Sequence, residues 1–106
     1  MPVKLLIAYD VKSGREEEYY RFVIGEFLPT AQSIGLQTIE AWRTVWGDYP
    51  QRLLEMVADN QTELNEILND ERWREMETKL ESYVNDYQRL AVPYRSGFQF
   101  FKPAEQ

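Results

Sequence analysis

The 106-residue chain contains no cysteine and no histidine. Without cysteine it has no disulfide, no thiolate nucleophile and no cysteine-type zinc site. Without histidine it lacks an imidazole metal ligand and the base of the usual Ser-His and Cys-His pairs. Any proton transfer would need a carboxylate, a lysine or a tyrosine with a shifted pKa, or a substrate that ionises by itself. These absences exclude most hydrolase mechanisms and argue against a metal site.

Long apolar runs are also missing. The first predicted strand holds only the short run from Leu5 to Tyr9, whereas a membrane helix needs about 20 apolar residues. The start of the chain has no feature of a signal peptide, so we expect a cytoplasmic protein without membrane contact. The length fits one domain, which we place at residues 1–102, with 103–106 as a frayed tail.

Basic residues are outnumbered, 12 to 18, which gives a net charge of −6. The whole excess lies between Asp59 and Asp86, where nine acidic residues face three basic ones. This stretch is interpreted as a solvated helical face, or alternatively as an acidic docking surface for a basic partner. Because a phosphate backbone would be repelled, we expect no nucleic-acid binding.

The first third of the chain predicts a strand followed by a helix. Residues 3–11 alternate with apolar groups on both faces, which is typical of a strand. Ser13 to Glu16 matches a capping box, and apolar residues then recur at steps of three and four. Pro29 falls inside this pattern and should kink or restart the helix, and Gly35 should supply a left-handed C-cap.

The middle of the chain predicts a hairpin. Residues 37–46 and 51–58 form its two strands around the turn at 47–50. A second capping box then begins at Asn60, and Asp70 is a new N-cap after a one-turn break.

A second apolar helical stripe runs from Trp73 to Tyr87, and residues 94–102 form the last predicted strand. The order β-α-β-β-α-β predicts an α+β, ferredoxin-like fold, in which two helices cover one face of a four-stranded antiparallel sheet.

The strands carry large apolar residues on both faces, although helices can cover only one. Several such residues exposed together would make an unusually large apolar patch for a monomer. A second copy, packed sheet against sheet with two-fold symmetry, would bury them, so we expect a homodimer. The alternative is a monomer with scattered apolar surface residues.

The sequence resembles the dimeric α/β-barrel superfamily, which includes antibiotic-biosynthesis-type monooxygenases and NIPSNAP-like proteins. The features that carry the resemblance are the element order, Pro29 ahead of the Gly35 cap, the Trp-rich second strand and the acidic turn Asp70-Glu71-Arg72 before Trp73. The resemblance covers nearly the whole chain and concerns its layout. It implies a dimer whose two sheets form a barrel, with a pocket in each subunit between sheet and helices.

The resemblance also suggests ligand-binding residues. In related monooxygenases a Trp and an Asn from the region of Trp73, with tyrosines, line a cavity for a polyphenolic or other aromatic substrate. These enzymes use no metal or flavin, so no cofactor is expected here. Asn69 and Trp73 would share a helical face if the helix ran unbroken through Asp70. Alternatively, Trp73 is ordinary core packing and Asn69 a helix-terminal residue.

Arg43 is the only charged residue on a strand face that otherwise holds Ile39, Ala41 and Val45. It could bind a substrate carboxylate or phenolate, pair with Glu55, or extend to the sheet edge.

Tyr9 and Tyr94 lie near predicted sheet ends and could donate to a ligand or to backbone. Trp42, Trp46 and Phe98 are candidates for the dimer interface, where aromatic residues are enriched.

Two classes of function are compatible with these residues. The first is a small-molecule pocket protein, whether a cofactor-free oxygenase or an isomerase, acting on an aromatic, anionic or enol-type compound. The second is a non-catalytic homodimer that senses, carries or scaffolds. A shaped cavity above about 300 Å³ with convergent polar groups would favour the first.

Overall fold

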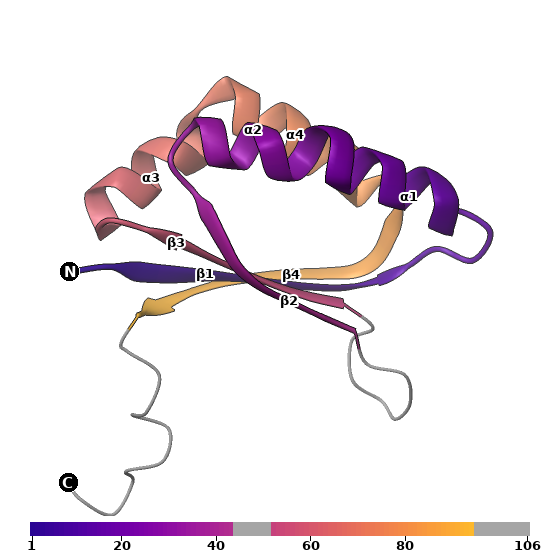
Figure 1. Cartoon of the computed structure of the whole chain (residues 1–106), viewed down its shortest axis with the longest axis horizontal. Helices are drawn as coiled ribbons and strands as arrows, with labels where there is room; N and C mark the ends of the chain where they lie inside the picture. Colours follow the sequence, from indigo (N-terminus) through magenta and orange to yellow (C-terminus); the bar gives the residue numbers. More distant parts are fainter. Residues whose placement is uncertain (44–51, 95–106) are drawn as a thin grey trace, which may run out of the picture.

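The computed structural model describes residues 1–43 and 52–94. Its four strands form one antiparallel sheet in the order β2-β3-β1-β4, and all the described helices lie on one face of it (Figure 1). The strands are β1 (Val3–Val11), β2 (Gln37–Arg43), β3 (Arg52–Ala58) and β4 (Val84–Pro93). The helices are α1 (Glu16–Phe22), the π-helix η1 (Val23–Phe27), α2 (Leu28–Ser33), α3 (Gln61–Asn69) and α4 (Glu71–Glu81). This architecture confirms the predicted ferredoxin-like fold.

The hydrophobic core fills the space between sheet and helices. In β1 and β3 every second residue is buried, which is the expected pattern for strands covered on one face. The largest fully buried side chains are Trp73, Tyr9, Phe27, Leu5, Ile7, Leu36, Met56, Leu64 and Leu80. They come from β1, β3, the helices and, for Leu36, the link between α2 and β2, so the core joins the two layers.

The first helical segment runs in three pieces, because Pro29 cannot donate a helical hydrogen bond. The helix accommodates the proline through a π-turn, in which the N–H of Leu28 donates to the carbonyl of Val23, five residues earlier in the chain. The helix then restarts with Pro29 in its first turn, as predicted. Gly35 follows with φ +113°, which confirms the left-handed turn at the helix end.

The start of α1 differs from the prediction. Ser13 does not cap the helix; Arg15 is the N-cap residue and makes no capping hydrogen bond with its side chain. The Glu16 carboxylate instead accepts the N–H of Gly14 at 3.0 Å. Gly14 adopts φ +83°, and this turn separates Ser13 from the helix it was predicted to cap.

The two predicted caps in the second half are confirmed. The Asn60 side chain accepts the N–H of Glu63 at 2.8 Å, and that of Asp70 accepts the N–H of Arg72 at 2.8 Å. The backbone of Asp70 is extended, with ψ 135°, so α3 and α4 are separate helices.

The last strand lies earlier in the chain than its sequence pattern predicts. We predicted a helix through Tyr87 and a strand over 94–102, whereas α4 ends at Glu81 and β4 already begins at Val84. Asp86 has φ +55°, which a helix interior does not allow, and the pairing of β4 with β1 shifts register beside it. Beyond Tyr94 the predicted strand lies outside the described residues.

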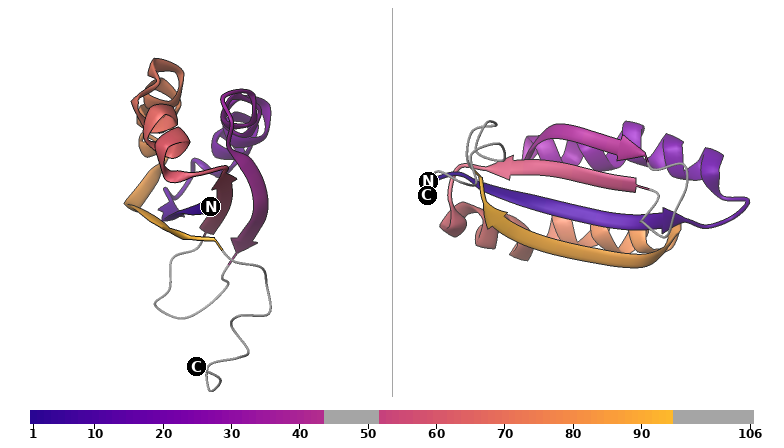
Figure 2. Two further views of the ribbon diagram at one scale, coloured as in Figure 1. Left: turned by 90° about the vertical axis from the view of Figure 1, so that its left-hand side faces the viewer. Right: turned by 90° about the horizontal axis from the view of Figure 1, so that it is seen from below.

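The outer face of the sheet carries no helix within the described part of the chain (Figure 2). The register places Leu6 of β1 between Glu55 of β3 and Leu90 of β4 on this face, and Trp42 of β2 lies opposite Leu53. Leu90 is 60% exposed and Trp42 is 52% exposed. Large apolar residues therefore lie on both faces of the sheet, as predicted, with the Lys4–Glu55 ion pair among those on the outer face.

Among the described helices, none is long and apolar enough to cross a membrane.

Candidate ligand-binding cleft beside the edge strand

β2 is the one described strand in which every residue is exposed. Thr38, Ala41 and Arg43 nevertheless face the helical side of the sheet, because their partners across the ladder are the buried Met56, Leu54 and Arg52 of β3. The sheet bends at this point, with a register shift between Thr38 and Glu40. The helical layer therefore leaves the inner face of this edge strand uncovered.

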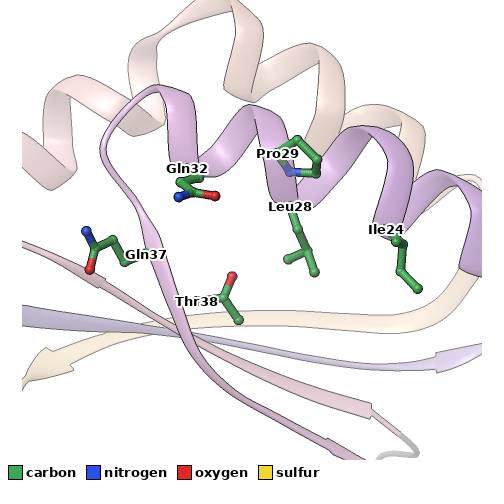
Figure 3. Close-up of a pocket in the computed structure, with 6 residues that line it drawn as sticks. All are labelled: Ile24, Leu28, Pro29, Gln32, Gln37 and Thr38. Carbon is green, nitrogen blue, oxygen red and sulfur yellow. The ribbon is translucent and has the colours of Figure 1, made fainter.

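A cleft of about 470 Å³ occupies this uncovered corner, between η1, α2 and the start of β2. Its lining residues are Ile24, Leu28, Pro29, Gln32, Gln37 and Thr38 (Figure 3). Ile24 and Leu28 extend from the helices toward the strand, and Thr38 extends upward toward them. Ile24 is 66% exposed, so apolar surface of this side chain is open to solvent.

The local sequence explains why the cleft forms. Ile24, Leu28 and Gln32 are spaced by four residues, so they lie on one side of the helical segment. The turn at Gly35 then returns the chain so that β2 runs below that side (Figure 1). The cleft offers two amides and one hydroxyl among apolar walls, a lining suited to hydrogen bonding rather than to proton transfer.

A cationic group lies at the other end of β2. Arg43 and Arg52 are directly opposite each other in the β2–β3 ladder, both on the inner face. Arg52 is only 9% exposed; its guanidinium donates to the Tyr20 hydroxyl at 3.0 Å and lies over the rings of Tyr19 and Tyr20. Like charges directly opposite each other destabilise a sheet unless something offsets them.

Neutral phenols surround Arg52 on the core side. The Tyr9 and Tyr19 hydroxyls are 2.6 Å apart and both rings are buried. Burial raises the pKa of the Tyr9 phenol far above its ordinary value, and also raises the pKa of Tyr19. These phenols therefore stay protonated and serve as structural hydrogen-bonding groups.

A third, partly buried phenol continues this group. The ring of Tyr87 stacks on Tyr9 with centroids 6.4 Å apart, and its hydroxyl donates to Glu77 at 2.6 Å. Burial raises the pKa of Tyr87 as well. Glu77 also forms an ion pair with Arg89, so its charge is shared between two donors.

The structure does not bring the predicted ligand-binding residues into one cavity. Tyr9 and Trp73 are fully buried in the core. Asn69 is exposed at the end of α3, where its amide donates to the Asn65 carbonyl. Tyr94 follows β4, with the Lys4 ammonium 5.2 Å from its ring centroid, and Lys4 belongs to the outer face. Of the five candidates, only Arg43 lies on the edge strand beside the cleft.

The predicted shared face of Asn69 and Trp73 does not exist, because the extended backbone of Asp70 interrupts the helix between them. Trp73 packs against Phe27, with ring centroids 5.4 Å apart, which fits the core-packing alternative. Its indole N–H is buried and has no hydrogen-bond partner in the described structure.

The predicted pair of Arg43 with Glu55 is also not formed. Glu55 lies on the outer face, where it accepts the Trp42 indole N–H at 2.7 Å and pairs with Lys4 at 3.0 Å. The register shift in β2 also changes the predicted faces, since Thr38 rather than Ile39 lies on the same side as Ala41. Trp46 and Phe98 lie outside the described residues.

Sequence reasoning missed the residues that line the cleft. The available signal was that Ile24 and Leu28 are apolar but fall outside the buried helical stripe. Their role as a wall depends on the uncovered edge strand, which no local pattern predicts.

The sequence matches no protein-family model and none of the curated proteins. Solved structures do resemble it. A NIPSNAP family protein from Agrobacterium tumefaciens is 16% identical, over 90% of this chain and 87% of that one, with a TM-score of 0.65. An ethyl tert-butyl ether D (EthD) family protein from Bacillus halodurans is 15% identical over 90% and 100%, with a TM-score of 0.71. A dimeric protein of unknown function and ferredoxin-like fold from Bacteroides fragilis is 13% identical over 88% and 96%, with a TM-score of 0.60.

At these identities the likeness concerns the fold. It confirms the ferredoxin-like architecture and the predicted resemblance to NIPSNAP-like proteins.

Proposed function

We propose that the protein is a homodimer that binds a small organic molecule in the cleft between η1, α2 and β2. The observation that carries the proposal is the uncovered inner face of β2, where a cleft of about 470 Å³ combines apolar walls with the side chains of Gln32, Gln37 and Thr38. A cavity of this size is typical of small-molecule sites. A bound molecule would cover apolar surface, such as that of Ile24, which the protein itself leaves exposed.

The lining of the cleft supports binding more directly than catalysis. Its amide and hydroxyl groups can orient a carbonyl or hydroxyl of the ligand, and none of the six lining side chains ionises. This favours a sensor or carrier.

Catalysis on an aromatic or enol compound, without a cofactor, is the second candidate. The paired Arg43 and Arg52 favour it, because positive charge stabilises a developing phenolate or enolate. Oxygen consumption with such compounds, lost in Arg43→Gln, would support this candidate over a carrier.

The homodimer is proposed from the apolar outer face of the sheet and from the Bacteroides fragilis neighbour, which is described as dimeric. Packing two such faces together would remove Trp42 and Leu90 from water in both copies at once.

The cleft can be tested by filling it. A ligand-observed NMR screen of small aromatic and aliphatic metabolites should give hits for the unaltered protein, and Thr38→Phe should abolish them. Thr62→Phe, an equal change on the exposed first turn of α3, is the matched control and should retain the hits. Hits that survive Thr38→Phe with unchanged affinity would place the binding site elsewhere.

A further inference from the structure

We propose that the ligand of the cleft is an uncharged molecule with an amide-type group, such as a carboxamide or a lactam, on an apolar body. This inference rests on the proposed function, because it requires the cleft to be a binding site. It adds the chemical class of the ligand, and it predicts that carboxylates and amines of the same shape bind more weakly.

The first argument is the lack of charge around the cleft. None of the six described lining residues carries a charge. All six come from residues 22–39, where the sequence has one charged residue, Glu26, and this pairs with Lys79 at 3.1 Å. A carboxylate or an ammonium would give up part of its hydration on entering the cleft, and no opposite charge among the lining residues would compensate for the loss. An uncharged ligand avoids this cost.

The second argument is the hydrogen-bonding capacity of the lining. Within the described structure, the side chains of Gln32, Gln37 and Thr38 make no hydrogen bond to another protein group. Each of these side chains can both donate and accept. An amide group in the ligand can also do both, so one glutamine can donate to it and accept from it. A carboxylate only accepts and an ammonium only donates, so either would leave part of this capacity unused.

The third argument is the arrangement of the lining along the cleft (Figure 3). Gln32 lies on α2 and the Thr38 hydroxyl extends toward the helical side, so both border the polar end of the cleft. Ile24 and Leu28 lie farther along the helical segment and form the apolar end. At about 1.5 Å per residue, Ile24 and Gln32 are separated by roughly 12 Å along the helix. The ligand therefore has its amide group at one end and an apolar body, of this length or shorter, at the other.

Three probes of nearly the same shape test the chemical class: cinnamamide, cinnamate and cinnamylammonium. Binding is measured at neutral pH by chemical-shift titration of the isotope-labelled protein. Cinnamamide should bind, and each of the two charged probes should bind at least about tenfold more weakly, because neither has a counter-charge in the cleft. Thr38→Phe should abolish the binding of cinnamamide, because the ring fills the cleft.

Gln32→Glu converts one amide of the cleft to a carboxylate of nearly the same shape. It should weaken cinnamamide about threefold to tenfold, the range for losing one uncharged hydrogen bond. It should also strengthen cinnamylammonium, which should then bind most tightly of the three probes. Gln32 is exposed, so the fold should persist, and thermal unfolding checks this. The matched control is Gln61→Glu, which adds the same charge on the exposed first turn of α3 and should leave the order of the probes unchanged.

The results separate this inference from the proposed function. Equal affinity for cinnamate and cinnamamide, or no binding of cinnamamide, would overturn the amide assignment. An order of affinities that Gln32→Glu leaves unchanged, or that Gln61→Glu changes equally, would also overturn it. If Thr38→Phe still abolishes the binding of other ligands from the screen, the cleft remains a binding site and only the chemical class is wrong. Binding of the probes that survives Thr38→Phe would contradict the cleft itself.

Discussion

The hydroxyls of Tyr9 and Tyr19 form a buried polar contact between sheet and helices. Both hydroxyls are buried away from water, and a single hydrogen bond of 2.6 Å joins them, in which one hydroxyl donates and the other accepts. Removing one hydroxyl leaves its partner buried without that contact, which costs about 1–3 kcal/mol, whereas removing both is much less unfavourable.

We therefore expect Tyr9→Phe to lower the free energy of unfolding by about 1–2 kcal/mol, and the double variant Tyr9→Phe/Tyr19→Phe to lower it by no more than the single one. Urea unfolding measures both. Tyr83→Phe, a change at a half-buried ring, should alter stability by less than about 0.5 kcal/mol. Additive losses from the two tyrosines would contradict a mutually dependent pair.

The raised pKa values of Tyr9 and Tyr19 predict a loss of stability in alkali. The unfolded chain releases these protons above about pH 10, while the folded protein retains them. Their contribution is thus complete below that pH and declines above it, by up to about 1.4 kcal/mol per pH unit for each phenol. Urea titrations between about pH 8 and about pH 11 should show the decline, and it should be shallower in the double phenylalanine variant. Equal slopes in the two proteins would rule out these groups as the cause.

At the scale of elements, two glycines of the first helical segment have opposite roles. Gly25 lies in η1 without a positive φ, and an added Cβ would meet nothing within 4 Å. Gly35 has φ +113°, and an added Cβ would lie 3.2 Å from Cδ1 of Ile67. The first glycine is thus replaceable, and the second is needed for the turn into β2.

Gly25→Ala should raise the free energy of unfolding by about 0.5–1 kcal/mol, because alanine loses less backbone entropy in a helix. Gly35→Ala should lower it by about 1 kcal/mol or more, because of its backbone conformation and the close contact. Thermal and urea unfolding of the two variants provide the comparison, with each serving as the control for the other. Destabilisation by both would mean that the π-turn itself requires glycine.

The element order and most boundaries could be predicted because they depend on local chemistry: alternation in β1, a proline inside a helix, and side-chain caps at Asn60 and Asp70. β4 could not be placed from its pattern. Tyr83, Val84 and Tyr87 continue the helical spacing of α4, and the inward positions of β4 include Arg89 instead of a large apolar residue. The missed signal was Asn85-Asp86, a pair that favours turns and, at Asp86, tolerates a positive φ.

The candidate site was less predictable than the fold. Arg43 was identified because a lone charge on an apolar strand face is visible in the sequence. Which residue lies opposite Arg43 depends on the register of the hairpin. The register shift in β2 changes that register, and the residue opposite is Arg52. The cleft depends on how far the helices extend over the sheet, a property of the assembled layers that no single segment encodes.

At the scale of the whole molecule, the apolar residues on the outer face of the sheet lead us to expect a homodimer that forms through this face. Leu90→Glu places a charge on this face, on the edge strand β4 and opposite Leu6 of β1. Because Leu90 is 60% exposed in the single chain, the substitution should leave the fold intact and shift the dimer to a 12.7 kDa monomer at micromolar concentration. Sedimentation velocity measures this change.

Thr78→Glu adds the same charge on the exposed side of α4 and is the matched control, expected to remain dimeric. A wild-type protein that sediments as a monomer would refute the dimer, and a Leu90→Glu dimer would move the interface to another surface.

The strand order has a consequence for how the chain acquires its structure. β1 occupies an inner position of the sheet, yet both of its partners, β3 and β4, follow it far along the sequence. During synthesis β1 is therefore made before either of its partner strands, and until they are made its backbone is unpaired and its apolar side chains are uncovered. By contrast, β2 and β3 are close in sequence and can pair as soon as both are made. Such distant pairings close large loops and slow the search for the native state. The interval before β3 and β4 appear is when this chain is most exposed to aggregation.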